Sequence, residues 1–171
     1  QTKARILKVE RDVPVDVIYK AFHMCARTHE DFFATDLISD ILSRGHSSRL
    51  NQSLVKEQKL FTNIDAFVGG SIDNGLFYFA GKLAPNITMQ EAEKGIDAEI
   101  EKLKASLVAD NELRKVKNKV IFAHMFSELN VLNKAMNLAT SELIGDANLV
   151  NKQIDLYEAV TSDKIMTIAQ H

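Results

Sequence analysis

The sequence of 171 residues lacks several features that would indicate a specialised class of protein. It has one cysteine, Cys25, which excludes an intramolecular disulfide framework. It contains no apolar run of about eighteen residues or more, so no segment is predicted to span a membrane. Its formal net charge is −2 and its pI about 6.2, so no basic character argues for nucleic acid as a partner. Hydrophobic residues make up 46% and charged residues 26%, the balance of an ordinary globular domain.

The organisation of the chain predicts one domain over residues 1–171. It shows no internal repeat, low-complexity segment or linker, and its length is enough for one sizeable core. It begins with Gln-Thr-Lys, shows no signal peptide and stops within a helical pattern. We therefore expect a piece cut from a longer protein.

Strands are predicted mainly in the first half. The segment 4–26 indicates a short strand, a break at Pro14 and a long strand over residues 15–26. Both faces of the long strand are largely apolar, so we expect it to be central in its sheet and covered on both sides. Residues 60–70 and 76–85, joined by the turn sequence GGSIDNG, predict an antiparallel hairpin.

Helices are predicted between these strands and throughout the second half. Apolar spacing indicates a helix before Gly45, a second one capped by Ser47 or Ser48, and a third that begins with the capping box Thr88–Glu91. Beyond residue 110 everything is helical, with a bend expected near residues 126–130. Two apolar stripes follow this segment: Leu113, Val116, Val120 and Ala123, then Leu132, Met136, Ala139 and Leu143. The pattern predicts an α+β fold, with helices packed on one face of a mainly antiparallel sheet.

Residues that could carry chemistry are scattered. His124 and Glu128 are four apart and could share a metal ion, but a structural or surface pair is favoured because no third ligand is near. His23 and Cys25 share one strand face, where packing is favoured over a nucleophile and its base.

Two further segments have plain structural interpretations. The acidic segment 29–31 is interpreted as a helix cap. The glycine-rich segment 69–75 is interpreted as a hairpin turn rather than a phosphate cradle, because it lies between strands and lacks the Lys-Ser/Thr ending. No motif, taken by itself, predicts catalysis.

The sequence does resemble a known family, in segments that span nearly the whole chain. These segments are ERDVPVDVIYKAFH, DLISDILSRGHSSRLNQSLVKEQKLF, GLFYFAGKLAP, ELRKVKNKV, LNKAMNLATSELIGD and YEAVTSDKIMTIA. In this order they are similar to the second, C-terminal and non-zinc domain of the pitrilysin/insulinase zinc metallopeptidases, most of all the bacterial members with two such domains per chain. The resemblance implies an α+β domain like those of metalloproteases and mitochondrial processing peptidases, which close like a clamshell around a peptide.

The resemblance also implies where the chemistry lies. In this family the first domain carries an inverted His-Xaa-Xaa-Glu-His zinc motif, and this sequence contains none. Some second domains supply an Arg and, seven residues on, a Tyr that bind substrate and stabilise the oxyanion. Those positions fall here on Val55 and Thr62, and the neighbouring Lys56 would point about 100° away around the helix. We therefore expect no catalytic, cofactor-binding or metal-binding residue in this segment.

Two functions remain as expectations. In the first, the chain is the non-catalytic C-terminal domain of a zinc-dependent metalloendopeptidase and forms part of the peptide-binding clamshell and of an inter-domain or inter-subunit interface. Its partners would be a zinc-bearing N-terminal domain of the same chain, a second family subunit that supplies the Arg and Tyr, and a peptide substrate. In the second, the parent is catalytically silent and serves as a scaffold or assembly subunit. The residues do not indicate a compartment; bacterial cytoplasm is the starting assumption.

Overall fold

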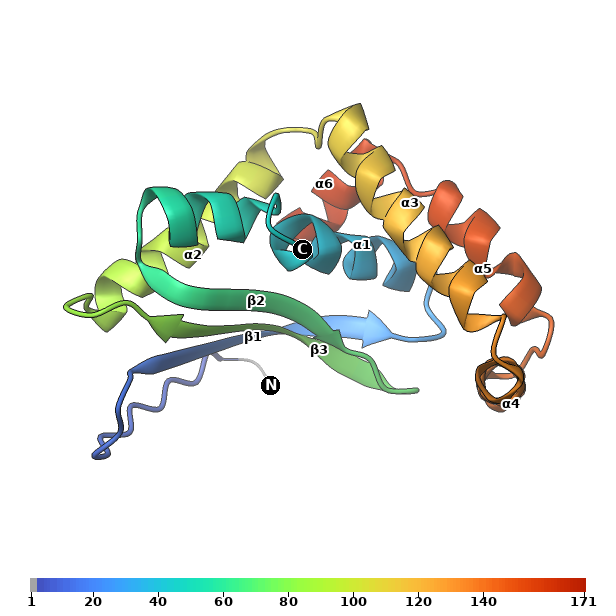
Figure 1. The fold of residues 1–171 in the computed structure, drawn as a ribbon, viewed down its shortest axis with the longest axis horizontal. Helices are drawn as coiled ribbons and strands as arrows, with labels where there is room; N and C mark the ends of the chain where they lie inside the picture. Colours follow the sequence, from blue (N-terminus) through green and yellow to red (C-terminus); the bar gives the residue numbers. More distant parts are fainter. Residues whose placement is uncertain (1–2) are drawn as a thin grey trace.

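Three antiparallel strands and seven helices form two layers in the computed structural model, which describes residues 3–171 (Figure 1). The sheet lies in one layer and the helices cover one of its faces, which confirms the predicted α+β class. The elements in chain order are β1 (Val17–Ala26), α1 (Phe32–Ser43), η1 (Asn51–Glu57), β2 (Phe61–Gly69), β3 (Asn74–Leu83), α2 (Met89–Ala105), α3 (Asp110–Ser127), α4 (Val131–Ile144), α5 (Leu149–Glu158) and α6 (Ser162–Gln170).

The strand order is β1-β3-β2, which corrects the position expected for the first long strand. The hairpin of β2 and β3 forms as predicted, and β1 pairs with the other side of β3, so β3 is central and β1 lies at an edge. The apolar residues on the second face of β1 are not covered: Tyr19 is 75% exposed. The short strand expected before Pro14 is also absent, because residues 3–13 lie exposed without a pairing strand.

The core lies between the covered face of the sheet and the helices. Helix α1 contributes much of it, with Leu37, Ile41 and Leu42 almost fully buried, and it packs on β2, α6 and α3. From the sheet, Phe77 and Phe79 of β3 point into the same core. The apolar stripe read from the sequence is buried as expected, but the polar side of α1 is buried as well: Thr35, Ser39 and Asp40 are each 7% exposed or less.

The segment after α1 begins as expected but does not form an ordinary α-helix. Arg49 and Leu50 are helical, and residues 51–57 then form a π-helix, in which the Gln58 amide donates to the Ser53 carbonyl five residues back at 2.9 Å. Ser48 does not cap it, because its hydroxyl donates to the Gly45 carbonyl instead of accepting from a helix amide.

Helix ends elsewhere follow the predicted signals. The Thr88–Glu91 capping box forms at α2, Thr161 caps α6, and Gly145 ends α4 in the left-handed conformation with φ of 116°. The bend expected near residues 126–130 is a complete break: the Asn130 side chain accepts from two amides of the next helix and starts α4 as a separate helix.

Candidate functional site

The residues proposed from sequence as possible ligands or catalysts do not converge. Within residues 3–171, no three His, Cys, Asp or Glu side chains lie together in a group that could hold a metal ion. Glu128 is engaged by the Asn137 amide at 3.0 Å rather than by His124. His23 is exposed on the uncovered sheet face, and burial raises the pKa of the Cys25 thiol, which disfavours the thiolate that a nucleophile needs.

The segment 29–31 connects the start of α1 to α6 and does not cap α1 with a side chain. Asp31 stands at the N-cap position of α1, but its side chain makes no cap hydrogen bond. It pairs with Lys164 of α6 instead, and this contact raises the pKa of the Lys164 ammonium. The glycine-rich segment 69–75 is the hairpin turn that the sequence predicts; its Ser71 carbonyl accepts from the Arg27 amide at 3.2 Å.

Val55 and Thr62 lie where the resemblance expects an Arg and a Tyr, and both have structural surroundings. Val55 is part of η1 and packs half-buried against the core. Thr62 is exposed on β2, and its hydroxyl donates to the Lys82 carbonyl at 3.2 Å, beside a register shift between Phe61 and Asn63. Neither side chain offers a charge or a phenol, and Lys56 donates to the His46 carbonyl at 3.1 Å.

An acidic pair on α1, buried at Asp40 and half-buried at Asp36, was not singled out from the sequence. Asp36 and Asp40 stand four residues apart on one face of the helix, and burial raises the pKa of both carboxyls. Tyr157 of α5 donates to Asp36 at 2.6 Å, and Arg44 donates to both oxygens of Asp40 at 2.9 and 3.1 Å. Burial and the nearby Asp36 carboxyl also raise the pKa of Tyr157.

This acidic pair does not fit a zinc site. Its oxygens are occupied by Tyr157 and Arg44, and among residues 3–171 no third ligand stands beside them. The pair instead ties α1 to α5. The spacing of two Asp residues within an apolar helical stripe is the signal in the sequence that could have indicated it.

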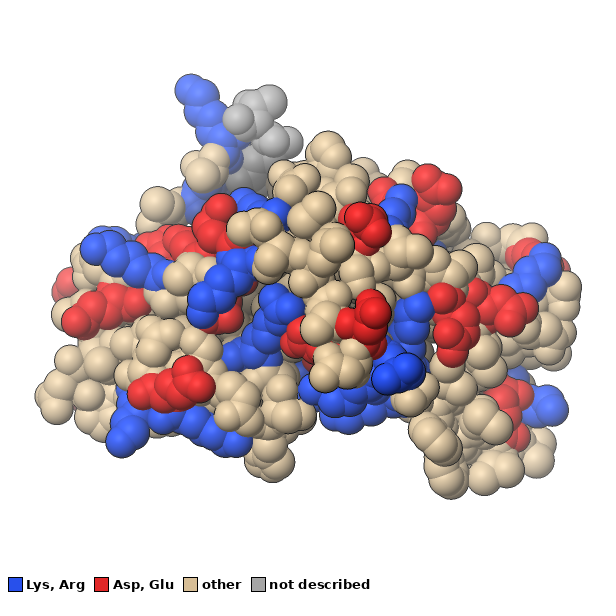
Figure 2. All heavy atoms as spheres, turned by 90° about the horizontal axis from the view of Figure 1, so that it is seen from above, with Lys and Arg blue, Asp and Glu red and all other residues tan. Residues whose placement is uncertain are grey.

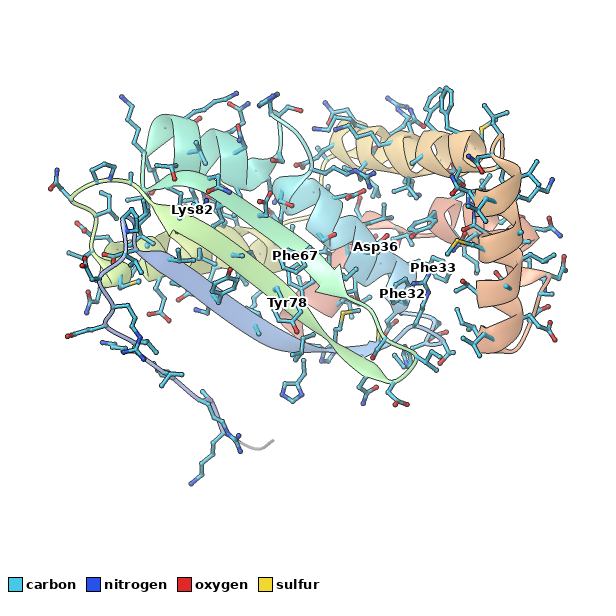
Figure 3. The ribbon with its side chains drawn as sticks, turned by 60° about the horizontal axis from the view of Figure 1, so that its bottom comes forward. Phe32, Phe33, Asp36, Phe67, Tyr78 and Lys82 are labelled. Atoms are coloured by element: carbon cyan, nitrogen blue, oxygen red, sulfur yellow. The ribbon has the colours of Figure 1, made fainter. Side chains whose placement is uncertain are left out.

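The face of the sheet opposite the helices carries exposed aromatic side chains. Figure 3 looks onto this face, where Phe67 of β2 and Tyr78 of β3 lie side by side. Their rings are stacked with centroids 5.3 Å apart and an angle of 23° between their planes. On β1, Ala21 is in register with Tyr78, and Tyr19 is in register with Ala80.

Charge does not mark any part of the helical side as a binding site. In Figure 2, which shows the molecule from above, Lys and Arg are interspersed with Asp and Glu without a large field of one sign.

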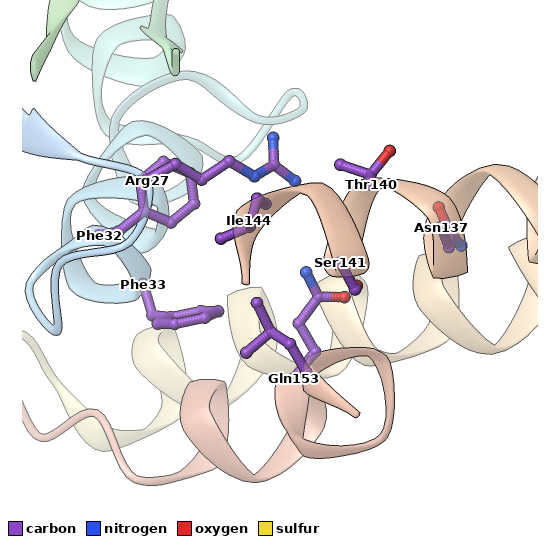
Figure 4. A pocket seen from close by; sticks show the side chains of 9 residues that line it. Arg27, Phe32, Phe33, Asn137, Thr140, Ser141, Ile144 and Gln153 are labelled. Carbon is purple, nitrogen blue, oxygen red and sulfur yellow. The ribbon is translucent and has the colours of Figure 1, made fainter. Parts of the chain in front are cut away.

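No helix within residues 3–171 has both the length and the apolarity needed to cross a bilayer. A pocket of about 200 Å³ lies between α1, α4 and α5 (Figure 4), smaller than the usual ligand cavity of about 300 Å³ or more. A second, more open hollow of about 520 Å³ lies between the end of α1, at Asp40 and Arg44, and β2.

Fold and surfaces together define an α+β domain with one uncovered sheet face. The profile of the family described as the peptidase M16 inactive domain matches residues 1–120. The chain therefore belongs to the M16 peptidase family, as a domain of its inactive type, and the family resemblance noted in the sequence is confirmed.

Named relatives agree with this assignment. The zinc protease PqqE of Helicobacter pylori is 30% identical over 118 residues, which are 68% of this chain and 27% of that protein. The crystal structure of a protease from H. pylori matches 95% of this chain and 40% of its own with a TM-score of 0.88 and 23% identity. The inactive peptidase domain of a proposed zinc protease from Bordetella parapertussis matches with a TM-score of 0.83 and 24% identity, over 95% of this chain and 88% of its own. This chain thus spans well under half the length of these H. pylori relatives.

Proposed function

We propose that this chain is the non-catalytic C-terminal domain of a zinc-dependent metalloendopeptidase, and that its uncovered sheet face forms part of the wall of the peptide-binding cleft. Membership of the inactive M16 domain family supports the first part, since such a domain implies a catalytic domain in the same chain. Zinc would then be held by that other domain, because the residues described here do not fit a zinc site.

The observation that carries the cleft-wall role is the composition of the uncovered face. Tyr19 is 75% exposed, Val17 39% and Phe67 44%, beside exposed polar residues such as His23, Asp65 and Lys82. The other face of the sheet contributes to the core. A sheet that is apolar on both faces is normally covered on both. Exposed apolar surface of this kind marks a site of interaction, and stacked aromatic rings such as Phe67 and Tyr78 suit contact with peptide side chains or a facing domain.

A second family subunit completes this proposal. Val55 and Thr62 cannot bind a substrate carbonyl as an Arg and a Tyr would, so those two groups would come from a partner subunit. The parent of this chain would then be the zinc-bearing member of the pair. Its substrate is an extended peptide, and the uncovered face supplies contact area rather than reacting groups.

Steady-state kinetics of the full parent protein, paired with its second subunit, test this role. We expect Tyr19→Ser with Phe67→Ser to raise KM for a peptide substrate about tenfold while kcat stays within about twofold, because contact made equally in ground and transition states affects KM alone. Ile72→Ser is the matched control, since Ile72 is 51% exposed in the hairpin turn, outside the two strands that carry the replaced residues. Unchanged KM in the double variant would refute the cleft-wall role. A parent that holds no zinc and cleaves nothing even with its partner would indicate the scaffold function instead.

A further inference from the structure

The small pocket between α1, α4 and α5 gathers polar side chains that have no partner within the chain. Ser141 and Thr140 of α4 and Gln153 of α5 line it (Figure 4). None of these three side chains makes a hydrogen bond with any part of the chain that the structure describes. Because polar groups inside a protein are nearly always hydrogen-bonded, several of them without partners around one pocket require an explanation.

Ser141 is the most informative of the three. It is the one buried residue of α4, with 7% of its surface exposed. The hydroxyls of Ser43 and Ser127 donate to carbonyls of the preceding turn of their own helices, but within residues 3–171 the Ser141 hydroxyl donates to none. Figure 4 shows the amide of Gln153 turned toward Ser141. Two hydrogen-bonding groups therefore remain available to a molecule in the pocket.

Arg27, which follows β1, brings a positive charge to the same pocket. Its guanidinium lies over the Phe32 ring, 5.6 Å from the ring centroid, and Figure 4 shows it reaching toward Thr140. Burial raises the pKa of Asp36 and the charge of Arg27 partly offsets this, yet that carboxyl accepts from Tyr157 and does not line the pocket. Arg27 is half-buried and forms no ion pair within residues 3–171. A guanidinium carries five donors, so this one can bind an anion.

The rest of the lining limits what that anion can be. The rings of Phe32 and Phe33 and the side chain of Ile144 give the pocket an apolar part. Among residues 3–171 no Asp or Glu lines it, so an ammonium group would find no counter-charge there. Arg27 is the one cation of the lining in the described chain, which suits a single negative charge better than a phosphate. The volume equals that of roughly seven waters at about 30 Å³ each, so the bound group is small.

We propose that this pocket binds a small carboxylate that carries one apolar group and no neighbouring ammonium. Arg27 holds the carboxylate, since guanidinium and carboxylate form strong paired hydrogen bonds. The three unpartnered side chains supply further donors, and the apolar part of the lining contacts the apolar group. Such a mixture of an apolar lining with a few placed polar groups is usual for a small-ligand site.

This chemistry occurs in free monocarboxylic acids and in the C-terminal residue of a peptide. Thr140, Ser141 and Gln153 lie beyond residue 120, where the match to the family profile ends. We therefore assign the site to this chain rather than to the inactive domains in general.

Nuclear magnetic resonance of the ¹⁵N-labelled 171-residue chain, titrated with phenylacetate, tests the proposal. A domain of this extent folds on its own, because the inactive peptidase domain from B. parapertussis is a separate chain and the match covers 88% of it. We expect a Kd of about 1 mM or tighter, with amide shifts around the pocket that include the side chain of Gln153. Phenylacetamide has the same shape without the charge and should bind about tenfold more weakly or worse. No catalysis is measured, so the outcome is separate from that of the cleft-wall role.

Variants locate the binding. Arg27→Gln should raise the Kd for phenylacetate about tenfold or more, because the charged donor is lost. Arg114→Gln is the matched control: Arg114 is exposed on α3, outside the pocket, and its loss should leave the Kd within about twofold. Ile144→Trp should abolish binding by filling the pocket while Arg27 is kept. Circular dichroism checks that each variant is folded.

A second ligand distinguishes the two sources of the carboxylate. N-acetylphenylalanine presents its carboxylate as the C-terminal residue of a peptide does. Tighter binding than that of phenylacetate would assign the site to peptide ends, and weaker binding would assign it to free acids. The proposal is overturned if neither acid binds with a Kd below about 10 mM, or if phenylacetamide or inorganic phosphate binds as tightly as the acids. Normal binding by folded Arg27→Gln, or shifts that lie away from the pocket, would overturn it as well.

Discussion

Removal of one hydroxyl group, in Tyr157→Phe, should destabilise the domain in a way that depends on pH. Tyr157 is 8% exposed, and its hydroxyl donates to Asp36 at 2.6 Å, joining α5 to α1. The ring also packs edge-on against Phe33 with centroids 5.0 Å apart, a contact that phenylalanine keeps. The variant therefore removes the hydrogen bond and little else.

The direction of the pH effect follows from the Asp36 carboxyl. Burial is the larger influence and raises its pKa above the ordinary value of 3.8, while the hydrogen bond from Tyr157 lowers it. Because the folded-state pKa is raised, this carboxyl supports the fold fully below about pH 3.8 and costs stability as pH rises through the folded value. Without the hydroxyl the pKa rises further, so the variant loses more on ionisation than the unaltered chain does.

The expected loss is about 1 kcal/mol in acid, where a bond to a neutral carboxyl is removed, and about 2–3 kcal/mol near neutral pH, where a buried carboxylate loses its donor. Urea unfolding of both proteins at pH 4 and pH 7.5 measures the difference. Tyr19→Phe is the matched control and should change stability by less than about 0.5 kcal/mol, since Tyr19 is on the uncovered face. A loss that is equal at both pH values, or as small as that of the control, would refute the reasoning about Asp36.

Two further predictions concern the hairpin and the segment before it. Val55→Ala and Thr62→Ser in the parent protein should leave peptide turnover within about twofold, with a stability cost of about 1 kcal/mol for Val55 from lost apolar contact; a 10²-fold or larger fall in kcat with the fold intact would make these positions functional. Gly81→Ala should destabilise the chain by about 1–3 kcal/mol, because a Cβ there would lie 2.7 Å from ring atoms of Phe61; thermal unfolding measures this, and an unchanged midpoint would contradict the close packing.

Local signals in the sequence predicted most of the fold. The capping box at Thr88, the left-handed end at Gly145 and the alternation in β2 each depend on residues close in the chain, and each is confirmed. The position of β1 was predicted wrongly because two apolar faces were taken to mean a central strand. Which strands pair depends on the path of the whole chain and not on the apolar faces of one strand. An edge strand can also be apolar on both faces when another domain or subunit covers one of them.

The stripes of the last helices show the same limit. The spacing of Leu113 and Val116 and that of Leu132 and Met136 are alike in sequence, yet the first pair is buried and the second exposed. Periodicity tells that a helix has an apolar side, not whether its own domain covers that side. For the candidate site, the expectation that Val55 and Thr62 have no catalytic role stays a prediction, while the Asp36–Tyr157 contact joins residues 121 positions apart and is not visible in either local segment.

The central claim is that this domain assists a zinc peptidase without doing the chemistry. Metal analysis and a chelator-sensitive peptide-cleavage assay, run side by side on the untagged 171-residue chain and on the full parent with its partner subunit, test it most directly. The account predicts about one zinc ion per parent chain and chelator-sensitive cleavage by the parent assembly, with no specifically bound zinc and no cleavage by the 171-residue chain. Stoichiometric zinc or chelator-sensitive cleavage that stays with the purified 171-residue chain, or a parent assembly that holds no zinc, would contradict it.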